Sequence, residues 1–220
     1  MIDFPDPENA DETGLVAVGG DLEVETLISA YTKGIFPWPH PGYPLLWFSP
    51  KERGIIKFEN LHISTSLKKF LKKTDYKITF NKAFAEVMEG CASVPRPGQN
   101  GTWVTREMKK AYLKFHQKGY AHSVECWDEK DLVGGLYGVW VGGAFVGESM
   151  FFKKDNASKM CLVSLIEFLR SQGHQWMDVQ MVTSVVERLG GEYVSQKKFL
   201  KMWELTLKKL SFESLKFPSI

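Results

Sequence analysis

The stretch AHSVECWDEKDLVGGLYGVWVGGAFVGESMFF, residues 121–152, decides the fold of this chain. Within it, His122–Trp127, Leu132–Val141 and Ala144–Phe152 have strand character, because each run contains β-branched and aromatic residues and is bounded by turn residues. Gly142–Gly143 separates the last two runs, and a two-residue glycine loop is typical of a tight β-hairpin. The stretch therefore predicts antiparallel strands in the middle of the chain.

Helices and strands alternate on both sides of these strands. After them the pattern predicts a helix, a strand, a short helix, a strand and a last helix, at residues 157–171, 176–182, 183–189, 192–195 and 197–209. Before them it predicts a helix at 64–73, a strand at 76–80 and two further helices at 82–91 and 106–118. Antiparallel strands followed by an alternating strand–helix tail favour an α+β fold, in which helices flank a mixed sheet.

The first 60 residues differ from the rest because glycine, proline and aromatic residues are frequent there. A short helix is predicted at 24–33, ending before Gly34. The sequence IFPWPHPGYPLLWFSP follows at residues 35–50, and its closely spaced prolines argue against a regular helix or a central strand. We expect its aromatic side chains to form an irregular wall, either a cap over the main domain or the lining of a ligand site. The chain thus divides into a small N-terminal domain, residues 1–62, and a larger domain, residues 63–220.

The composition is that of a folded protein in a reducing compartment. Of the 220 residues, 44% are hydrophobic and 25% are charged, and the net charge of +2 is too small to indicate a nucleic-acid partner by itself. The three cysteines and five histidines show no spacing typical of disulfides or of a zinc site, so no metal is expected. No apolar run approaches the roughly 18–20 residues of a membrane span, and the acidic N-terminus is unlike a signal peptide. We therefore expect a cytoplasmic protein that does not bind membranes.

Common catalytic motifs are missing from the sequence. It contains no GxxxxGK[ST] phosphate loop, no GxGxxG after a strand, no HExxH and no GxSxG. No nucleophile–base pair is visible, and His116 and His122 are interpreted as structural. This pattern fits an enzyme whose acyl donor arrives already activated, which would need neither ATP nor a metal, but it also fits a protein that is not an enzyme.

A series of short motifs runs in a fixed order through nearly the whole chain. The motifs are GLVAVGGDL (Gly14–Leu22), GIFPW (Gly34–Trp38), LWFSP (Leu46–Pro50), GTWV (Gly101–Val104), AHSVECW (Ala121–Trp127), LVGGLYG (Leu132–Gly138), GESMF (Gly147–Phe151), ASK (Ala157–Lys159) and DVQ (Asp178–Gln180). Together they resemble the leucyl/phenylalanyl-tRNA–protein transferases from end to end.

The resemblance implies a fold and an activity. The fold is a small N-terminal domain followed by a larger domain similar to GCN5-type N-acetyltransferases. The activity is the transfer of leucine or phenylalanine, with methionine as a further donor, from aminoacyl-tRNA to the α-amino group of proteins that begin with Arg or Lys. Such a transfer marks the acceptor for degradation through the N-degron pathway, and no cofactor takes part.

The chain departs from the family pattern at a few positions. After the DxQ strand the family usually has a histidine where this chain has Val185, and an Ile-Pro-Arg-like segment is replaced by Val194, Ser195 and Gln196. The middle of DxQ is Val179 rather than cysteine, and Phe48 replaces a tryptophan. The changes at Val185 and Gln196 put details of tRNA or acceptor contact in question.

The resemblance implies that Asp178 and Gln180 form the catalytic centre. The two residues are separated by one position in a predicted strand, so we expect both side chains on the same face, where a carboxylate beside an amide can orient an attacking amine. Without the resemblance, the preferred interpretation would be a hydrogen-bonded polar pair that holds a sheet edge. Glu148 lies in an apolar strand, where a carboxylate needs a partner, and the resemblance assigns it to the substrate pocket.

The remaining substrate contacts also come from the resemblance. Leu136 and Phe145 match positions that hold the leucine or phenylalanine side chain, although as isolated residues they would be ordinary core. Trp47 and Trp103 match aromatic residues that face the terminal adenosine, where stacking of a base contributes about 1–3 kcal/mol. Either tryptophan could instead pack between the domains.

A basic stripe is predicted on the helix at residues 64–73. Lys68, Lys69, Lys72 and Lys73 have the spacing that collects side chains on one helix face, while Leu67, Phe70 and Leu71 occupy another. Such a stripe is normally a solvated surface, but a tRNA donor would make it a phosphate-binding surface that does not read base sequence.

Three other functions remain open from the sequence. An N-acetyltransferase that uses acyl-CoA would have the implied fold, but the Q/R-x-x-G-x-G/A pyrophosphate loop is missing. A non-enzymatic module that binds RNA or protein N-termini is conceivable, although Glu148, Asp178 and Gln180 argue against it. A transferase with a different donor or acceptor preference is compatible with every motif.

Overall fold

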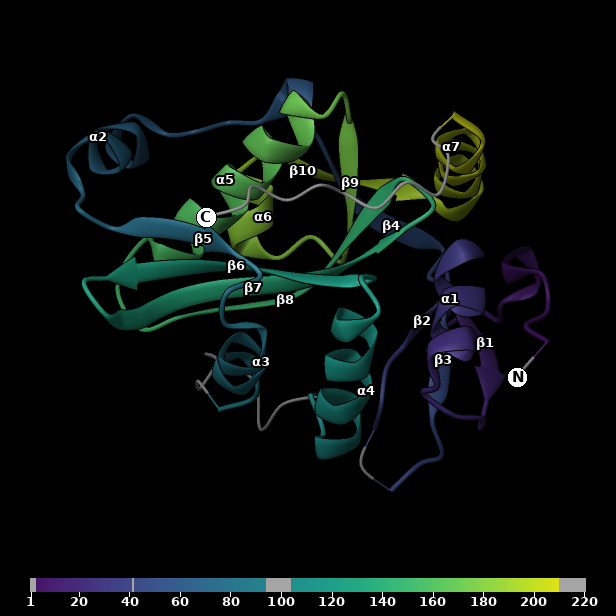
Figure 1. The fold of residues 1–220 in the computed structure, drawn as a ribbon. Helices are drawn as coiled ribbons and strands as arrows, with labels where there is room; N and C mark the ends of the chain where they lie inside the picture. The colour runs from purple at the N-terminus through teal and green to yellow at the C-terminus, as the bar shows by residue number, and fades with distance from the viewer. Residues whose placement is uncertain (1–2, 41, 94–103, 210–220) are drawn as a thin grey trace.

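The computed structural model describes residues 3–40, 42–93 and 104–209, which form two sheets and the helices around them (Figure 1). The small sheet has the strand order β1-β3-β2, from Leu15–Val18, Leu46–Phe48 and Phe36–Pro37. Helix α1, Val24–Thr32, lies next to this sheet in Figure 1. Lys33 caps its C-terminus, and the next residue, Gly34, has a φ of +71°. A left-handed glycine after the last turn is a common helix stop.

The large sheet has seven strands in the order β10-β4-β9-β8-β7-β6-β5. Their bounds are Glu52–Lys57 for β4, Lys77–Phe80 for β5, Ala121–Asp128 for β6, Asp131–Val141 for β7, Ala144–Phe152 for β8, Trp176–Gln180 for β9 and Gly191–Ser195 for β10. Strands β8 and β9 are parallel, and the other neighbouring pairs are antiparallel. The predicted α+β class with a mixed sheet is therefore confirmed, including the hairpin at Gly142 and Gly143.

Helices cover both faces of the large sheet. Helices α3, Phe84–Ser93, and α4, Arg106–Gln117, lie on one face, while α5, Ala157–Ser171, and α6, Ser184–Arg188, lie on the other (Figure 1). A hydrophobic core lies on each face of the sheet, and successive residues of β7 point into different cores. Tyr137 and Val139 belong to one core, and Leu136 belongs to the other. Helices α2, Thr65–Lys73, and α7, Gln196–Lys209, complete the chain at the two ends of the large sheet.

The N-terminal region is more regular than the sequence predicts. Strand β3 is the middle strand of the small sheet, so the expectation that residues 35–50 contain no central strand is wrong. The reason is local, because β3 lies between Pro44 and Pro50, and Pro37 lies on the edge strand β2, where a missing N–H is tolerated. Strand β4 precedes the predicted domain boundary after residue 62 but belongs to the large sheet; the division into domains stays a prediction.

Two β-bulges interrupt the large sheet around the β8–β9 pair. In the β7–β8 ladder Tyr137 is opposite Ser149 and Gly138 is opposite Gly147, which leaves Glu148 as the extra residue. In the β4–β9 ladder Gly54 is opposite Gln180 and Ile55 is opposite Asp178, which leaves Val179 as the extra residue. Bulges re-aim side chains and often lie beside active sites.

The parallel pair β8–β9 makes contact over a short distance. Its register places Val146 opposite Asp178, and the residues that follow on each strand border a pocket. The fold thus brings Glu148 and Gln180 to the opening between two strands.

Gly138 tests how tightly the first bulge is packed. A Cβ on Gly138 would lie 2.3 Å from the Val146 carbonyl oxygen and 2.4 Å from the Phe145 ring. Because the backbone at this point has little freedom to move, we expect Gly138→Ala to lower the free energy of unfolding by about 3 kcal/mol. Gly119→Ala is the control, since it adds a Cβ in open space at a φ of +83° and should cost about 1 kcal/mol. Equal losses in chemical denaturation would contradict the prediction.

Candidate active site

A pocket of about 290 Å³ opens beside the parting strands β8 and β9. This volume is at the lower end of sites for small molecules. Its walls are mostly apolar side chains. They come from β2 and the residue after it (Phe36, Pro37, Trp38), β7 (Leu136, Tyr137), β8 (Gly147, Glu148, Ser149, Met150, Phe152), α5 (Ser158, Leu162), β9 and the turn after it (Met177, Val179, Gln180, Met181, Thr183), and α6 (Val185, Val186).

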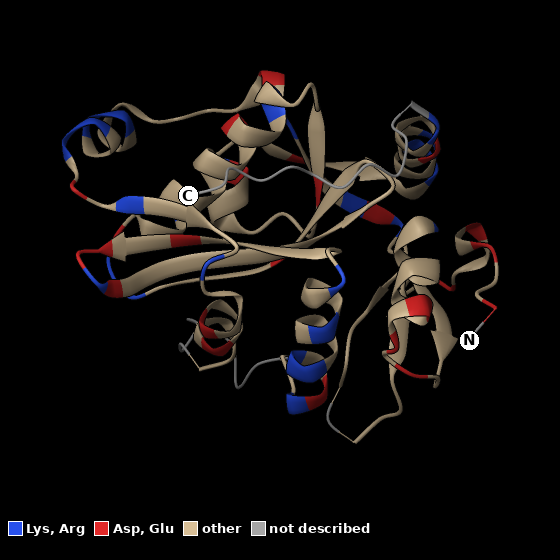
Figure 2. Cartoon of the chain, viewed as in Figure 1, with Lys and Arg blue, Asp and Glu red and all other residues tan. Residues whose placement is uncertain are grey.

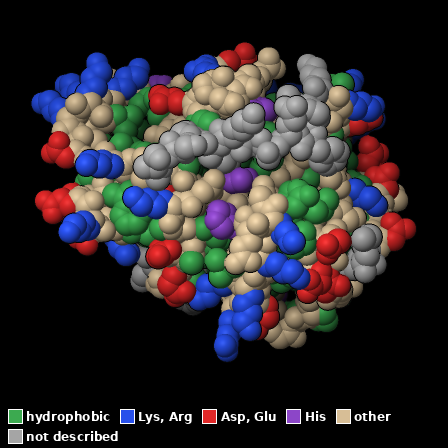
Figure 3. All heavy atoms as spheres, viewed as in Figure 1, with side chains coloured by type: hydrophobic (Ala, Val, Ile, Leu, Met, Phe, Trp, Pro, Cys, Tyr) green, Lys and Arg blue, Asp and Glu red, His purple; other side chains and the backbone are tan. Residues whose placement is uncertain are grey.

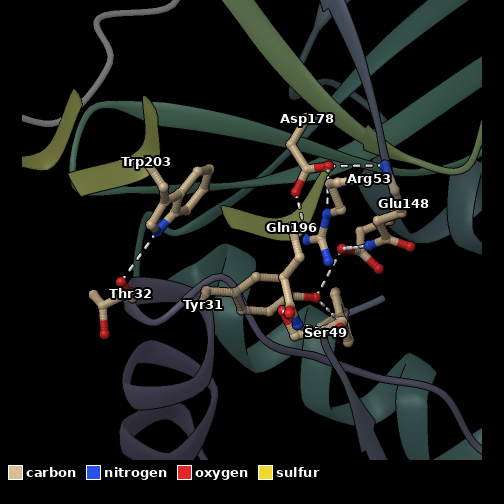
Figure 4. A network of polar contacts seen from close by, with 10 residues as sticks. Tyr31, Thr32, Ser49, Arg53, Glu148, Asp178, Gln196 and Trp203 are labelled. Atoms are coloured by element: carbon tan, nitrogen blue, oxygen red, sulfur yellow. Dashed lines mark hydrogen bonds and ion pairs between the residues drawn. The ribbon is translucent and has the colours of Figure 1, made fainter. Parts of the chain in front are cut away.

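Glu148 is the carboxyl group in this lining, and one of its oxygens is fully engaged. The Tyr31 hydroxyl and the Gln180 amide nitrogen each donate a hydrogen bond of 2.8 Å to Oε1. The Tyr31 oxygen also makes a short hydrogen bond with the Tyr112 hydroxyl. Figure 4 shows how Tyr31 from α1 and Glu148 from β8 meet in this network. Three segments far apart in the sequence therefore hold one carboxyl oxygen in place.

The other oxygen of Glu148, Oε2, has no hydrogen-bond partner among the described residues and no contact with solvent. Burial raises the pKa of Glu148 to about 8, and the negative charge of Asp178 adds to this effect. The bonds from Tyr31 and Gln180 and the positive charge of Arg53 lower the pKa and only partly offset the increase. Near neutral pH the carboxyl group is mostly protonated, and Oε2 is the oxygen available to carry the proton.

The two tyrosines remain proton donors. Burial, followed by the negative charge of Glu148, raises the pKa of Tyr31 and of Tyr112 well above the ordinary value. Both hydroxyls are thus neutral at any physiological pH, and they support Glu148 without exchanging protons with it.

Asp178 lies behind the pocket rather than in its wall. Its side chain is 0% exposed and accepts two hydrogen bonds from Arg53, 2.9 Å from Nε to Oδ1 and 2.6 Å from Nη2 to Oδ2. The backbone N–H of Gln180 donates a third bond of 2.8 Å to Oδ1. The polar contacts of Asp178 are therefore directed at Arg53 and at the backbone of the next turn (Figure 4).

The predicted placement of Asp178 and Gln180 on one strand face is not what the structure shows. The bulge at Val179 breaks the alternation, and Gln180 has a φ of +59°, in the left-handed region. As a result the Gln180 side chain lines the pocket and reaches Glu148, while Asp178 faces Arg53. The two residues remain linked through the Gln180 backbone.

Sequence comparison identifies the family to which the chain belongs. The family model described as leucyl/phenylalanyl-tRNA protein transferase matches residues 55–204, and the model of the N-terminal domain of that family matches residues 20–51. The chain belongs to this family. It is therefore a transferase enzyme, and the choice between an enzyme and a binding module is settled in favour of the enzyme.

Curated relatives extend over most of the chain. The leucyl/phenylalanyl-tRNA–protein transferase of Myxococcus xanthus strain DK1622 is 47% identical over 197 residues, which is 90% of this chain and 84% of the relative. Those of Lawsonia intracellularis and Desulfatibacillum aliphaticivorans are both 48% identical, over 90% and 93% of this chain and 86% and 88% of their own lengths. Among solved structures, the C-terminal domain of a putative lysylphosphatidylglycerol synthetase from Agrobacterium fabrum matches 87% of this chain and 59% of that chain with 11% identity. Its TM-score of 0.41 is too low to support any conclusion.

Two tryptophans of the N-terminal region lie in different surroundings, and the predicted one is not at the pocket. Trp47 is 0% exposed, packs 4.7 Å from the Phe4 ring and donates from Nε1 to the Gly19 carbonyl oxygen, so neither ring face is open to a base. Trp38, which the sequence does not single out, lines the pocket instead. Trp103 lies outside the described residues.

The other predicted pocket residues divide in the same way. Leu136 and Glu148 line the pocket, whereas Phe145 is 1% exposed and does not reach it. Val185, where the family usually has a histidine, is part of the wall. Gln196 is not part of the pocket wall, and its Nε2 donates to the carbonyl oxygens of Ser49 and Pro7. The change at Val185 therefore affects the pocket, and the change at Gln196 affects the attachment of the N-terminal segment.

The predicted basic stripe is present on the surface. Helix α2 begins after Ser64, whose hydroxyl accepts from the Leu67 N–H, and Leu67 is the buried side chain of the helix. The lysines at 68, 69, 72 and 73 are all exposed and none has an acidic partner in the described part of the chain. They form the dense blue group at the upper left of Figures 2 and 3.

Four residues of the site have no role in the sequence predictions: Arg53, Tyr31, Tyr112 and Trp38. Arg53 carries a weak signal, because a charged residue directly before the apolar run Gly54–Ile56 needs a buried partner. Trp38 is part of the GIFPW motif, but from the sequence Trp47 of the LWFSP motif is an equally plausible pocket residue. The tyrosines carry no signal, because each occupies a core position of an amphipathic helix.

No described helix has the length and apolar character needed to cross a membrane.

The raised pKa of Glu148 predicts how stability depends on pH. The folded protein holds this proton more tightly than the unfolded chain, so the contribution to stability is complete below pH about 4.5 and is lost as pH rises to about 8. We expect the free energy of unfolding of the wild type to fall, relative to Glu148→Gln, between pH 5 and 8 and then to level off. Chemical denaturation across this range measures the difference, and Glu86→Gln on the exposed face of α3 controls for loss of one carboxylate. A constant difference between wild type and Glu148→Gln would refute the assignment.

Proposed function

We propose that this transferase moves leucine or phenylalanine, with methionine as a further donor, from aminoacyl-tRNA to the α-amino group of proteins that begin with Arg or Lys. The product would be recognised for degradation through the N-degron pathway, in the cytoplasm. One observation carries the proposal: an apolar pocket in a chain of this family contains a single carboxyl group with one unpartnered oxygen, at Glu148. An apolar wall suits the donor side chain, and the carboxyl group suits the amine that attacks.

The donor side chain would lie against the apolar wall. Leu136, Leu162 and Met177 supply aliphatic surface on three different elements, β7, α5 and β9. A pocket of this kind discriminates by roughly 1–3 kcal/mol per methylene, which separates leucine from smaller aliphatic residues but not from similarly sized ones. Acceptance of leucine, phenylalanine and methionine by one pocket follows from this limited discrimination.

The reaction would be aminolysis of the ester between the amino acid and the terminal ribose. The nitrogen of the acceptor attacks the ester carbon, a C–N bond forms, the C–O bond to the ribose breaks, and one proton passes from the nitrogen to the ribose oxygen. The donor arrives activated, so no ATP or metal enters this balance. Positioning the amine against the ester can contribute roughly 7–11 kcal/mol to the lowering of the barrier.

Glu148 is well placed to carry the proton. An α-ammonium group has a pKa of about 7.7–8.0, and burial raises the pKa of Glu148 to about 8, so a proton shared between them has no strong preference. In the molecules in which Glu148 is ionised, Oε2 would accept it from the attacking nitrogen and release it to the ribose oxygen. The amide of Gln180 holds Oε1 from the other side, and Asp178 fixes the Gln180 backbone. We keep Asp178 and Gln180 as the proposed centre of the site and add Glu148 as the group that contacts the reacting atoms.

The terminal adenosine would stack on an aromatic side chain at the mouth of the pocket. Trp38 is the favoured partner, because it lines the pocket and its ring lies 5.7 Å from that of Phe48. Trp103 stays a proposed partner and Trp47 a supporting residue of the small sheet. We also propose a GCN5-type relationship for the larger domain, supported by the parallel pair β8–β9 that parts at the site.

The activity itself is tested with labelled donors. Wild-type protein incubated with leucine-labelled leucyl-tRNA should transfer the label to a protein that begins with Arg, without ATP and in the presence of EDTA. The same protein with an acetylated N-terminus is the matched control and should receive no label, because its amine is blocked. Transfer from labelled acetyl-CoA but not from leucyl-tRNA would show that the acyl-CoA alternative is correct. Activity that disappears with EDTA and returns with zinc would refute the metal-free mechanism.

The stripe on α2 is tested by its dependence on salt. Replacing Lys68, Lys69, Lys72 and Lys73 with Ala should weaken the binding of whole aminoacyl-tRNA, because phosphate contacts release counterions. The slope of log affinity against log salt concentration should become shallower by about 0.7–0.9 for each phosphate that no longer has a lysine beside it. A short aminoacyl-adenosine ester lacks most of the phosphate backbone and should be used equally well by both proteins. Identical salt slopes with whole tRNA would mean that the stripe is only a solvated surface.

A further inference from the structure

We propose that Arg53 is a positioning residue of this active site, which acts through Asp178 to fix the left-handed turn at Gln180 and so aims the Gln180 amide at Glu148. The inference rests on the proposed function, since it concerns how the proton-carrying group is held. It also gives Asp178 a specific task, that of an anchor rather than of a proton acceptor.

The environment of Arg53 makes it a rigid support. The residue is 1% exposed on β4, and its guanidinium group lies 4.6 Å from the ring centres of both Phe36 and Phe199. Its two bonds to Asp178 form the planar fork that arginine makes with a carboxylate. A lysine has neither the second donor in a fixed direction nor the flat surface for two rings, so it cannot replace this arginine.

Asp178 has little capacity left for a substrate. Its three described acceptor contacts come from Arg53 Nε, Arg53 Nη2 and the Gln180 N–H, and its side chain is absent from the pocket wall. A group that accepts a proton from the attacking amine must come within hydrogen-bonding distance of it. Asp178 is fully buried and is not part of the pocket wall, so its contact with the site is the hydrogen bond that it accepts from the Gln180 N–H.

The turn at Gln180 needs this support. A residue with a side chain in the left-handed region is strained and persists where surrounding structure holds it. Asp178 Oδ1 accepts a hydrogen bond from the Gln180 N–H. The backbone of β4 also passes close to the next residue, since a Cβ on Gly54 would lie 2.9 Å from the Met181 carbonyl carbon. In a regular strand Gln180 would share a face with Asp178, away from the pocket. The left-handed turn is what brings its amide 2.8 Å from Glu148.

The two charges of the pair also act on Glu148 in opposite directions. Arg53 lowers the pKa of Glu148 and Asp178 raises it. Removal of Arg53 alone should therefore move the pH profile of the reaction to higher pH, and removal of the Asp178 charge alone should move it to lower pH. Tyr31 and Tyr112, which also face Glu148, stay neutral and keep their contribution in each variant. Opposite shifts are not expected from two residues that merely stabilise the fold.

The experiment compares three variants with the wild type in leucine transfer. Arg53→Met with Asp178→Leu replaces the pair by apolar side chains, which proteins often tolerate, and should fold but lose about 10²-fold in kcat through misplacement of Gln180. Arg53→Lys should lose a similar factor, with little change in KM for aminoacyl-tRNA. Asp178→Asn keeps an acceptor oxygen for the Gln180 N–H and should lose no more than about 10-fold, with a pH profile moved to lower pH.

Crystal structures of the same variants read the position of Gln180 independently of turnover. We expect the Gln180–Glu148 hydrogen bond to be broken in the double variant and kept in Asp178→Asn. A folded double variant with this bond intact would overturn the inference, as would an Asp178→Asn enzyme that has Gln180 in place and is inactive. If the wild type transfers no leucine, the proposed function fails, and the structures still decide whether Arg53 holds Gln180.

Discussion

A charge removed from water needs a partner, and the buried pair of Arg53 and Asp178 sets the arrangement of the elements around it. Arg53 belongs to β4 and Asp178 to β9, so the pair fixes two neighbouring strands at one register. Phe36 from the small sheet and Phe199 from α7 cover the guanidinium group. Displacement of any one of these four elements would expose or unpair the charge, which couples the N-terminal region, the large sheet and the last helix.

The site itself depends on two irregularities of the sheet. Glu148 is the extra residue of one bulge, and Gln180 follows the extra residue of the other. Each bulge turns a polar side chain out of the regular alternation, and the two side chains meet at Oε1 of Glu148. Tyr31, from helix α1, donates the second hydrogen bond to that oxygen, and Tyr112, from helix α4, makes a hydrogen bond with the Tyr31 hydroxyl. The arrangement leaves the other oxygen of a mostly neutral carboxyl group buried and without a hydrogen-bond partner among the described residues, on a side chain that lines an apolar pocket.

The sequence predicts the parts of this protein that local patterns control. The strands at residues 121–152, the hairpin at Gly142–Gly143 and helix α5 have the expected type and nearly the expected bounds, because side-chain periodicity and turn residues specify them. Strand β4 is not predicted, since both of its neighbours come from the end of the chain and its own composition shows little alternation. The left-handed turn at Gln180 is likewise imposed by Asp178 and β4, which are contacts that periodicity does not describe. The choice between Trp38 and Trp47 depends on which side of the small sheet faces the pocket, and this too is a tertiary property.

The place of β4 in the sheet has a consequence for the synthesis of the protein. This strand is made early, but it pairs with β9 on one side and β10 on the other, which leave the ribosome more than 100 residues later. Until then its apolar residues Ile55 and Ile56 lack their strand neighbours, and Arg53 has no carboxylate. Contacts between residues so distant in the chain form slowly, because a long loop must close first. A nascent chain that ends before β9 therefore lacks Asp178 and Gln180, and the active site cannot form until more than 100 residues after β4 have been made.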